Sequence, residues 1–169
     1  MRKMRECIDS WLRDAHAMER ESSAFLGARL GRIVHYPSLH DLLEAHLHET
    51  NCQVERLEDF IAQRSRDAGP WKHLRARLQG EARSASLSLC GDEVIETVIA
   101  LVTQKQMEIA SYQILAAAAE EASDEEVAEL CQTLCQQEHM LVSRVQQQVP
   151  ELIHLYLLRE RIKGVPSKR

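Results

Sequence analysis

The chain has 169 residues with a formal net charge of −5, and its apolar residues make up 44% of the sequence while aromatic residues make up only 4%. The acidic balance argues against a nucleic-acid-binding protein, and no run approaches the roughly 18 uninterrupted apolar residues of a membrane span. No apolar signal segment follows the basic N-terminus either, so we expect a cytoplasmic protein. Six Gly and four Pro are too few for a turn-rich β fold, and the length suits one domain over residues 1–169.

The first half of the chain predicts two long helices, over residues 4–34 and 38–67. Apolar residues recur there at spacings of three and four, which is typical of the seam of a bundle helix. Pro37 separates the two helices, with Ser38 in a position to cap the second, and Gly69 and Pro70 end it. The short joint predicts an antiparallel hairpin.

The second half predicts two further long helices, over residues 92–122 and 124–149. Pro150 should break the fourth helix, which leaves a short fifth helix over residues 151–162. The joint between the third and fourth helices is short, whereas about twenty residues separate the second from the third, enough to travel the length of the bundle. Two hairpins joined by one long crossover predict an all-α, ferritin-like antiparallel four-helix bundle.

Each long helix carries one glutamate inside its apolar stripe: Glu19, Glu49, Glu108 and Glu138. The four residues lie at comparable distances along the chain from their hairpin turns, so we expect them to converge at one level near the middle of the bundle. Uncompensated carboxylates in a dry core would cost several kcal/mol each, so something must neutralise them. A metal site and a metal-free polar layer are the two interpretations.

Histidines favour the metal interpretation. His16 and His46 each lie three residues before a seam glutamate, Glu19 and Glu49, and this spacing keeps both side chains on one helix face. These four residues would be the preferred ligands, with Glu108 and Glu138 completing the set. A carboxylate-rich site with few nitrogen donors suits iron or manganese.

Lys105 favours the metal-free interpretation. It lies three residues before Glu108 in the same stripe, where its ammonium group would repel a metal ion and pair with a seam glutamate instead. His16 and His46 could then be ordinary core histidines. Cys131 and Cys135, one helical turn apart, could suggest a metal or redox pair, but two small buried side chains are the simpler interpretation.

The sequence also resembles the YciE/YciF-type ferritin-like proteins of bacteria. The stretches that carry the resemblance are residues 12–19 (LRDAHAME), 46–50 (HLHET), 53–58 (QVERLE), 108–112 (EIASY) and, more weakly, 137–138 (QE). The resemblance implies a ferritin-like bundle, often dimeric and stress-linked, with inward carboxylates at the four seam glutamates. The chain departs from the family at Lys105-Gln106, where Glu-His is expected, and at Val142, where an acidic residue is expected.

Two functions follow from these observations. One is a stress-related iron or manganese protein. The other is a metal-free helical scaffold that acts by dimerising or by binding a protein partner. Neither function specifies a substrate or a reaction. Four apolar residues lie outside the four-helix core and must bury against the bundle or against a partner: Trp71, Leu152, Leu155 and Leu158. We expect a homodimer that buries apolar residues of the crossover or of the fifth helix.

Overall fold

The computed structural model describes residues 2–67 and 92–162, and within these ranges every regular element is a helix. The elements are α1 (Arg2–Leu30), α2 (Pro37–Asp67), α3 (Glu93–Glu121) and α4 (Glu125–Arg161). The first four predicted helices are therefore confirmed, and their ends differ by a few residues from the expected ones except at the C-terminal end of α4. The crossover, with Trp71 and Cys90, lies outside the described residues. In the part of the chain that is described, no helix is long and apolar enough to cross a membrane.

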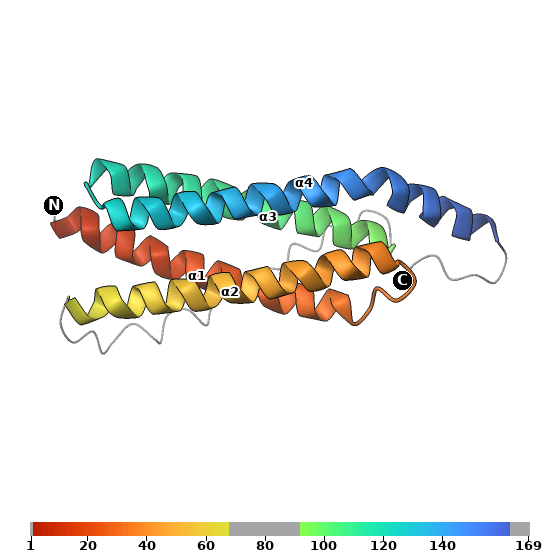
Figure 1. Cartoon of the computed structure of the whole chain (residues 1–169), viewed down its shortest axis with the longest axis horizontal. Coiled ribbons are helices and arrows are strands. Elements are labelled where there is room, and N and C mark those ends of the chain that lie inside the picture. The colour runs from red at the N-terminus through yellow and green to blue at the C-terminus, as the bar shows by residue number, and fades with distance from the viewer. Residues whose placement is uncertain (1, 68–91, 163–169) are drawn as a thin grey trace.

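The four helices form a bundle in which each sequential hairpin is antiparallel (Figure 1). α1 packs on α2 and α3 packs on α4, and the two hairpins meet through α1 with α3 and α2 with α4. The remaining pairs lie diagonally across the bundle, and their helices run parallel (Figure 1). α2 and α3 start at the same end of the bundle, so α2 ends at the end opposite to the start of α3 (Figure 1). This connectivity confirms the ferritin-like architecture.

The core consists of two apolar clusters separated along the bundle axis. One cluster gathers residues from the first half of α1 and the adjoining ends of α3 and α4, including Leu12, Leu115 and Leu134. The other lies toward the α1–α2 joint and includes Leu43 and Leu101. Between the clusters lies a layer of buried polar and charged side chains from all four helices: Glu19, Ser22, His46, Thr50, Gln53, Lys105, Glu108 and Glu138.

The predicted fifth helix is wrong, because α4 continues through Pro150 to Arg161. A proline inside a helix removes one backbone hydrogen bond and strains the preceding turn, which made a break the natural expectation. Contacts beyond the proline compensate for this loss. Leu152 is buried in the second apolar cluster, and the guanidinium of Arg159 lies 5.6 Å from the centre of the Tyr36 ring. The end of α4 consequently extends past the other helices (Figure 1).

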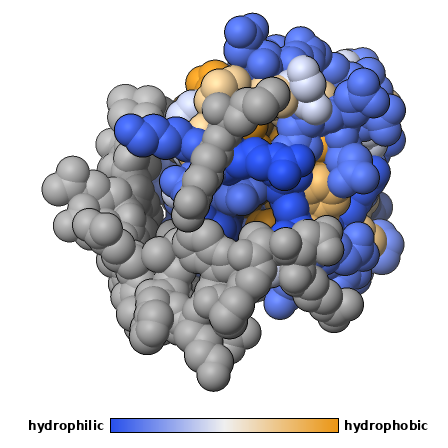
Figure 2. Space-filling model, turned by 90° about the vertical axis from the view of Figure 1, so that its left-hand side faces the viewer, coloured by the Kyte–Doolittle hydropathy of each residue, from blue (hydrophilic) through white to orange (hydrophobic). Residues whose placement is uncertain are grey.

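The joint between α3 and α4 lies at the end of the bundle opposite to the C-terminus of α4 (Figure 1), and hydrogen bonds fix its conformation. Ser123 has a φ of 54°, and it closes α3 with two hydrogen bonds that form a Schellman motif, from Ser123 N to Glu120 O and from Asp124 N to Ala119 O. Arg64 donates hydrogen bonds to both carboxylate oxygens of Asp124, at 3.1 and 2.6 Å. It also donates to Asp9 at 2.6 Å, so one side chain joins α1 and α2 to the start of α4. Figure 2 views this end, where the described residues present a mostly hydrophilic surface.

Candidate functional site

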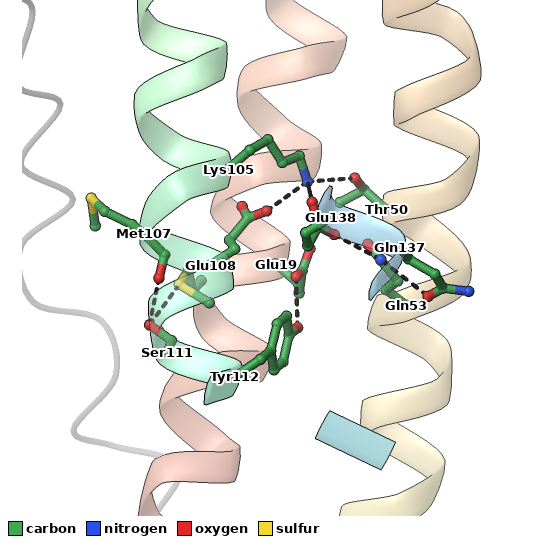
Figure 3. A network of polar contacts seen from close by, with 11 residues as sticks. Glu19, Thr50, Gln53, Lys105, Met107, Glu108, Ser111, Tyr112, Gln137 and Glu138 are labelled. Carbon is green, nitrogen blue, oxygen red and sulfur yellow. Dashed lines mark hydrogen bonds and ion pairs between the residues drawn. The ribbon is translucent and has the colours of Figure 1, made fainter. Parts of the chain in front are cut away.

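The polar layer brings together three of the four predicted glutamates. Glu19 from α1, Glu108 from α3 and Glu138 from α4 have no solvent exposure, and each offers a carboxylate oxygen within 4.8 Å of the others. Figure 3 shows these side chains pointing toward one another in the middle of the bundle. We call Glu19, Glu108 and Glu138 the carboxylate cluster.

Lys105 supplies the cation of the layer. Its Nζ lies 2.6 Å from Glu108 Oε2 and 2.9 Å from Glu138 Oε2, and it donates to Thr50 Oγ1 at 3.4 Å. Burial alone would lower the pKa of this amine, but the three surrounding carboxylates raise the pKa above its usual value. Lys105 is therefore charged, and it pairs with Glu108 as expected if it belongs to the buried layer.

Tyr112 holds the third carboxylate. Its hydroxyl donates a hydrogen bond of 2.6 Å to Glu19 Oε1. Burial raises the pKa of Glu19 to about 7, and the charge of Glu138 acts in the same direction, whereas Lys105 and Tyr112 oppose the shift. Burial, with the charge of Glu19, also raises the pKa of Glu108 well above its ordinary value. The cluster is thus short of positive charge.

Glu49 does not belong to the buried layer, and the prediction that all four glutamates converge is wrong at this position. The Glu49 side chain is 40% exposed, and its Oε1 accepts a hydrogen bond of 3.3 Å from Arg144 on α4. The neighbouring Thr50 is fully buried in its place. Positions 49 and 50 both lie three or four residues from His46 and from Gln53, so either could share their helix face. In the structure the inward face of α2 includes Thr50 rather than Glu49.

Gln53 is the second residue, after Thr50, that α2 contributes to the contacts of the carboxylate cluster. Its Nε2 donates to Glu138 Oε1 at 2.7 Å and to Gln137 Oε1 at 3.3 Å. Gln53, Thr50 and Tyr112 were not among the predicted site residues. The available signal was that Gln53 and Tyr112 stand in the apolar stripes of their helices, where a polar group needs a partner.

The two predicted histidines are placed differently. His46 is fully buried, and neither of its ring nitrogens has a hydrogen-bond partner. Burial, with the charges of Lys105 and Arg144, lowers its pKa to about 4, so the ring is neutral at pH 7 and available as a nitrogen donor. His16 is only half-buried, and burial lowers its pKa. The charges that also act on this pKa are those of Glu58, which raises it, and Arg20, which lowers it, rather than those of the carboxylate cluster.

The donor set fits one divalent cation better than two. Three carboxylates and one ammonium group leave two negative charges when all are ionised, which a single divalent ion would neutralise. Glu19 Oε2 and Glu108 Oε1 are buried without a hydrogen-bond partner, so they are the oxygens available to such an ion. Lys105 already takes the facing oxygens of Glu108 and Glu138, where a second ion would need ligands.

Other candidate groups have weaker chemistry. Cys131 and Cys135 are buried and form no disulfide, and the thiol of Cys135 donates to the carbonyl oxygen of Ile109 at 3.9 Å. Burial raises the pKa of both thiols, to about 12 for Cys131, so they behave as inert core residues. One further set of potential ligands among the described residues, His40, Asp41 and Glu44, lies at the surface, where acidic groups are common without an ion.

Comparison with known proteins places the chain among similar bundles. A family model described as "Domain of unknown function (DUF892)" matches residues 3–158. A crystal structure of a protein from Xanthomonas campestris pv. campestris is 31% identical, covers 94% of this chain and 99% of its own, and superimposes with a TM-score of 0.72. The E. coli stress protein YciF is 19% identical over 87% of this chain and 94% of its own, with a TM-score of 0.63. YcfI from Rhodopseudomonas palustris is 19% identical over 85% and 92%, with a TM-score of 0.60. The last two comparisons concern the fold alone.

Proposed function

Since the chain belongs to the DUF892 family, as its resemblance to the YciE/YciF-type proteins predicted, we propose that it is a stress-linked ferritin-like protein whose carboxylate cluster binds one Fe²⁺ or Mn²⁺ ion. The link to stress rests on the similarity to YciF, which is described as a stress protein. The metal site rests on the residues of this chain.

One observation carries the proposal. Three carboxylates from three helices lie within 4.8 Å of one another in a fully buried layer, and two of their oxygens, Glu19 Oε2 and Glu108 Oε1, have no partner. An unpartnered carboxylate oxygen in a core is costly unless a proton or a cation meets it. A single divalent ion would meet both oxygens and balance the charge of the layer.

The surrounding residues would each have a defined role. Tyr112 and Gln53 would orient Glu19 and Glu138 through their hydrogen bonds, and Lys105 would neutralise the oxygens with which it pairs, Oε2 of Glu108 and of Glu138. The ligand atoms that lie within 4.8 Å of one another are all carboxylate oxygens, and such a site with few nitrogen donors suits Fe²⁺ or Mn²⁺. Such an ion would supply Lewis-acid and one-electron chemistry in a site from which the bundle excludes water.

The metal-free scaffold is the second candidate, and Lys105 is the observation that favours it. Its two ion pairs already neutralise part of the cluster, and the raised pKa values of Glu19 and Glu108 would let protons neutralise the rest. The layer would then specify how the helices pack without holding an ion.

Titration with Mn²⁺ separates the two candidates. Protein dialysed against a chelator is titrated while electron paramagnetic resonance follows free Mn²⁺. We expect about one ion per chain, and a loss of at least about tenfold in affinity for Glu19→Gln, which removes one charged ligand. The matched control is Glu49→Gln, an exposed glutamate of the same bundle, which should bind as the parent protein does. Equal, weak binding by all three proteins would support the scaffold instead.

A further inference from the structure

The carboxylate cluster is closed on most sides. The two apolar clusters of the core lie above and below it along the bundle axis. Within each hairpin, α1 with α2 and α3 with α4, the helices pack most extensively. On the α1–α3 side, the buried side chain of Tyr112 closes the layer, and its hydroxyl donates a hydrogen bond to Glu19. An ion that reaches the cluster therefore needs a side chain that can move.

The α2–α4 seam is the least extensive of the four helix contacts, and Gln53 fills it beside the cluster. Gln53 is only 3% exposed, yet its amide is bonded on one side to Glu138 and on the other to Gln137, which is half-buried (Figure 3). The hydrogen bonds of these three residues form a path that leads from the cluster toward the surface.

Gln53 also has an unused oxygen. Its Nε2 serves both hydrogen bonds, while its own Oε1 is buried and has no partner. A buried carbonyl oxygen without a donor is uncommon because it loses its hydration without replacement. It is also a neutral ligand of the kind that divalent cations accept.

We infer that Gln53 is the relay through which a divalent cation enters and leaves the carboxylate cluster. Release of its two hydrogen bonds frees Glu138 Oε1 and opens the α2–α4 seam, where the amide oxygens of Gln53 and Gln137 offer neutral ligands on the way to Glu138. This inference rests on the proposed metal site and concerns the rate of exchange rather than the identity of the ligands.

Two substitutions at this position test the relay in opposite directions. Gln53→Ala removes the side chain that fills the seam, so the rate constants of Mn²⁺ association and dissociation should both rise by about tenfold, the effect expected from two lost hydrogen bonds. Gln53→Leu fills the seam with an apolar group that offers no ligand, so both rate constants should fall by about tenfold. Both variants lose the hydrogen bond that orients Glu138, so any weakening of the dissociation constant should be similar in the two, whereas their rate constants should move in opposite directions. Stopped-flow mixing with a fluorescent chelator of Mn²⁺ measures both rates.

A matched control is Gln136→Leu, a glutamine exposed on the same helix as Gln137, which should leave both rates unchanged. If Gln53→Leu does not fold, Gln137→Leu at the half-buried end of the path should slow exchange in its place. Rates that stay the same in the Gln53 variants overturn the relay while leaving the metal site intact, and so does a weaker affinity with an unchanged association rate. Absence of Mn²⁺ binding by the parent protein overturns the metal site, and the relay with it.

Discussion

Replacement of Lys105 by methionine tests the charge balance of the polar layer directly. Lys105 has no solvent exposure and lies 2.6 and 2.9 Å from two carboxylates, so Lys105→Met keeps an unbranched side chain and removes both ion pairs. Loss of one partner from a buried pair costs about 3–5 kcal/mol, because the remaining charges stay buried. One kcal/mol lowers the melting temperature of a chain of this size by about 2–4 °C, so we expect a fall of roughly 6–20 °C in metal-free buffer at pH 7.

The loss should depend on pH. Burial raises the pKa of Glu19 from 4.5 to about 7, so the folded state binds a proton that the unfolded state does not. That contribution to stability is complete below pH 4.5 and is lost as the pH rises through about 7. Without Lys105 the pKa values of the cluster should rise further, which makes the difference between parent and variant smaller at pH 5 than at pH 8.

Thermal unfolding followed by circular dichroism measures these effects, with Arg144→Met as the control. Arg144 is 52% exposed and its partner Glu49 is 40% exposed, so loss of that pair should cost less than about 1 kcal/mol. Mn²⁺ should restore the stability of Lys105→Met more than it stabilises the parent, because three free carboxylates bind the ion more tightly than a cluster already paired with an amine. A variant as stable as the control in metal-free buffer would refute the buried layer. A destabilised variant that Mn²⁺ does not rescue would refute the metal site alone.

Three further outcomes are expected. The pKa of His46 is lowered from 6.5 to about 4, so the neutral ring contributes stability above pH 6.5 that is lost as the pH falls to 4, about 3 kcal/mol in all, and His46→Leu should remove this component from urea unfolding curves. Arg64→Met should cost about 2 kcal/mol of unfolding free energy because it breaks charged hydrogen bonds to Asp9 and Asp124. An unchanged urea midpoint would show that these hydrogen bonds do not stabilise the fold. Sedimentation velocity should show a homodimer at tens of micromolar, and Leu158→Glu, on the exposed end of α4, should shift it to monomer if that surface forms the interface; a monomeric parent protein would contradict the prediction.

The long helices could be predicted because their spacing of apolar residues is regular and their joints are marked by local signals. Pro37 and Asp92 stand at or next to the observed helix starts. Pro150 is the instructive failure. A local rule predicts a break there, but contacts made far along the sequence, such as Arg159 with Tyr36, keep α4 continuous. The intrinsic helix propensity of a residue decides where a helix ends only if tertiary contacts favour neither outcome.

The candidate site could be predicted only in part. Glu19, Glu108 and Glu138 were identifiable because a charged residue in an apolar stripe is unusual. Spacing could not choose between Glu49 and Thr50, since both positions satisfy the helical period and the orientation of α2 depends on its neighbours. The bond between Tyr112 and Glu19 joins residues 93 positions apart, and no local pattern encodes such a pairing.

The direction of the four helices has a consequence for the electric field inside the bundle. Each end carries two helix N-termini and two helix C-termini, because the diagonal pairs α1 with α4 and α2 with α3 run parallel (Figure 1). The partial charges of about half an elementary unit at these termini therefore oppose one another at both ends, with the C-terminus of α4 farther out than the other termini at its end (Figure 1). The polar layer lies roughly 15–25 Å from the ends of α1 and α3 and about 35 Å from the C-terminus of α4, given the rise of about 1.5 Å per residue. Its potential is consequently set by its own side chains, so that a single substitution within the layer changes the field that any ion or proton experiences there.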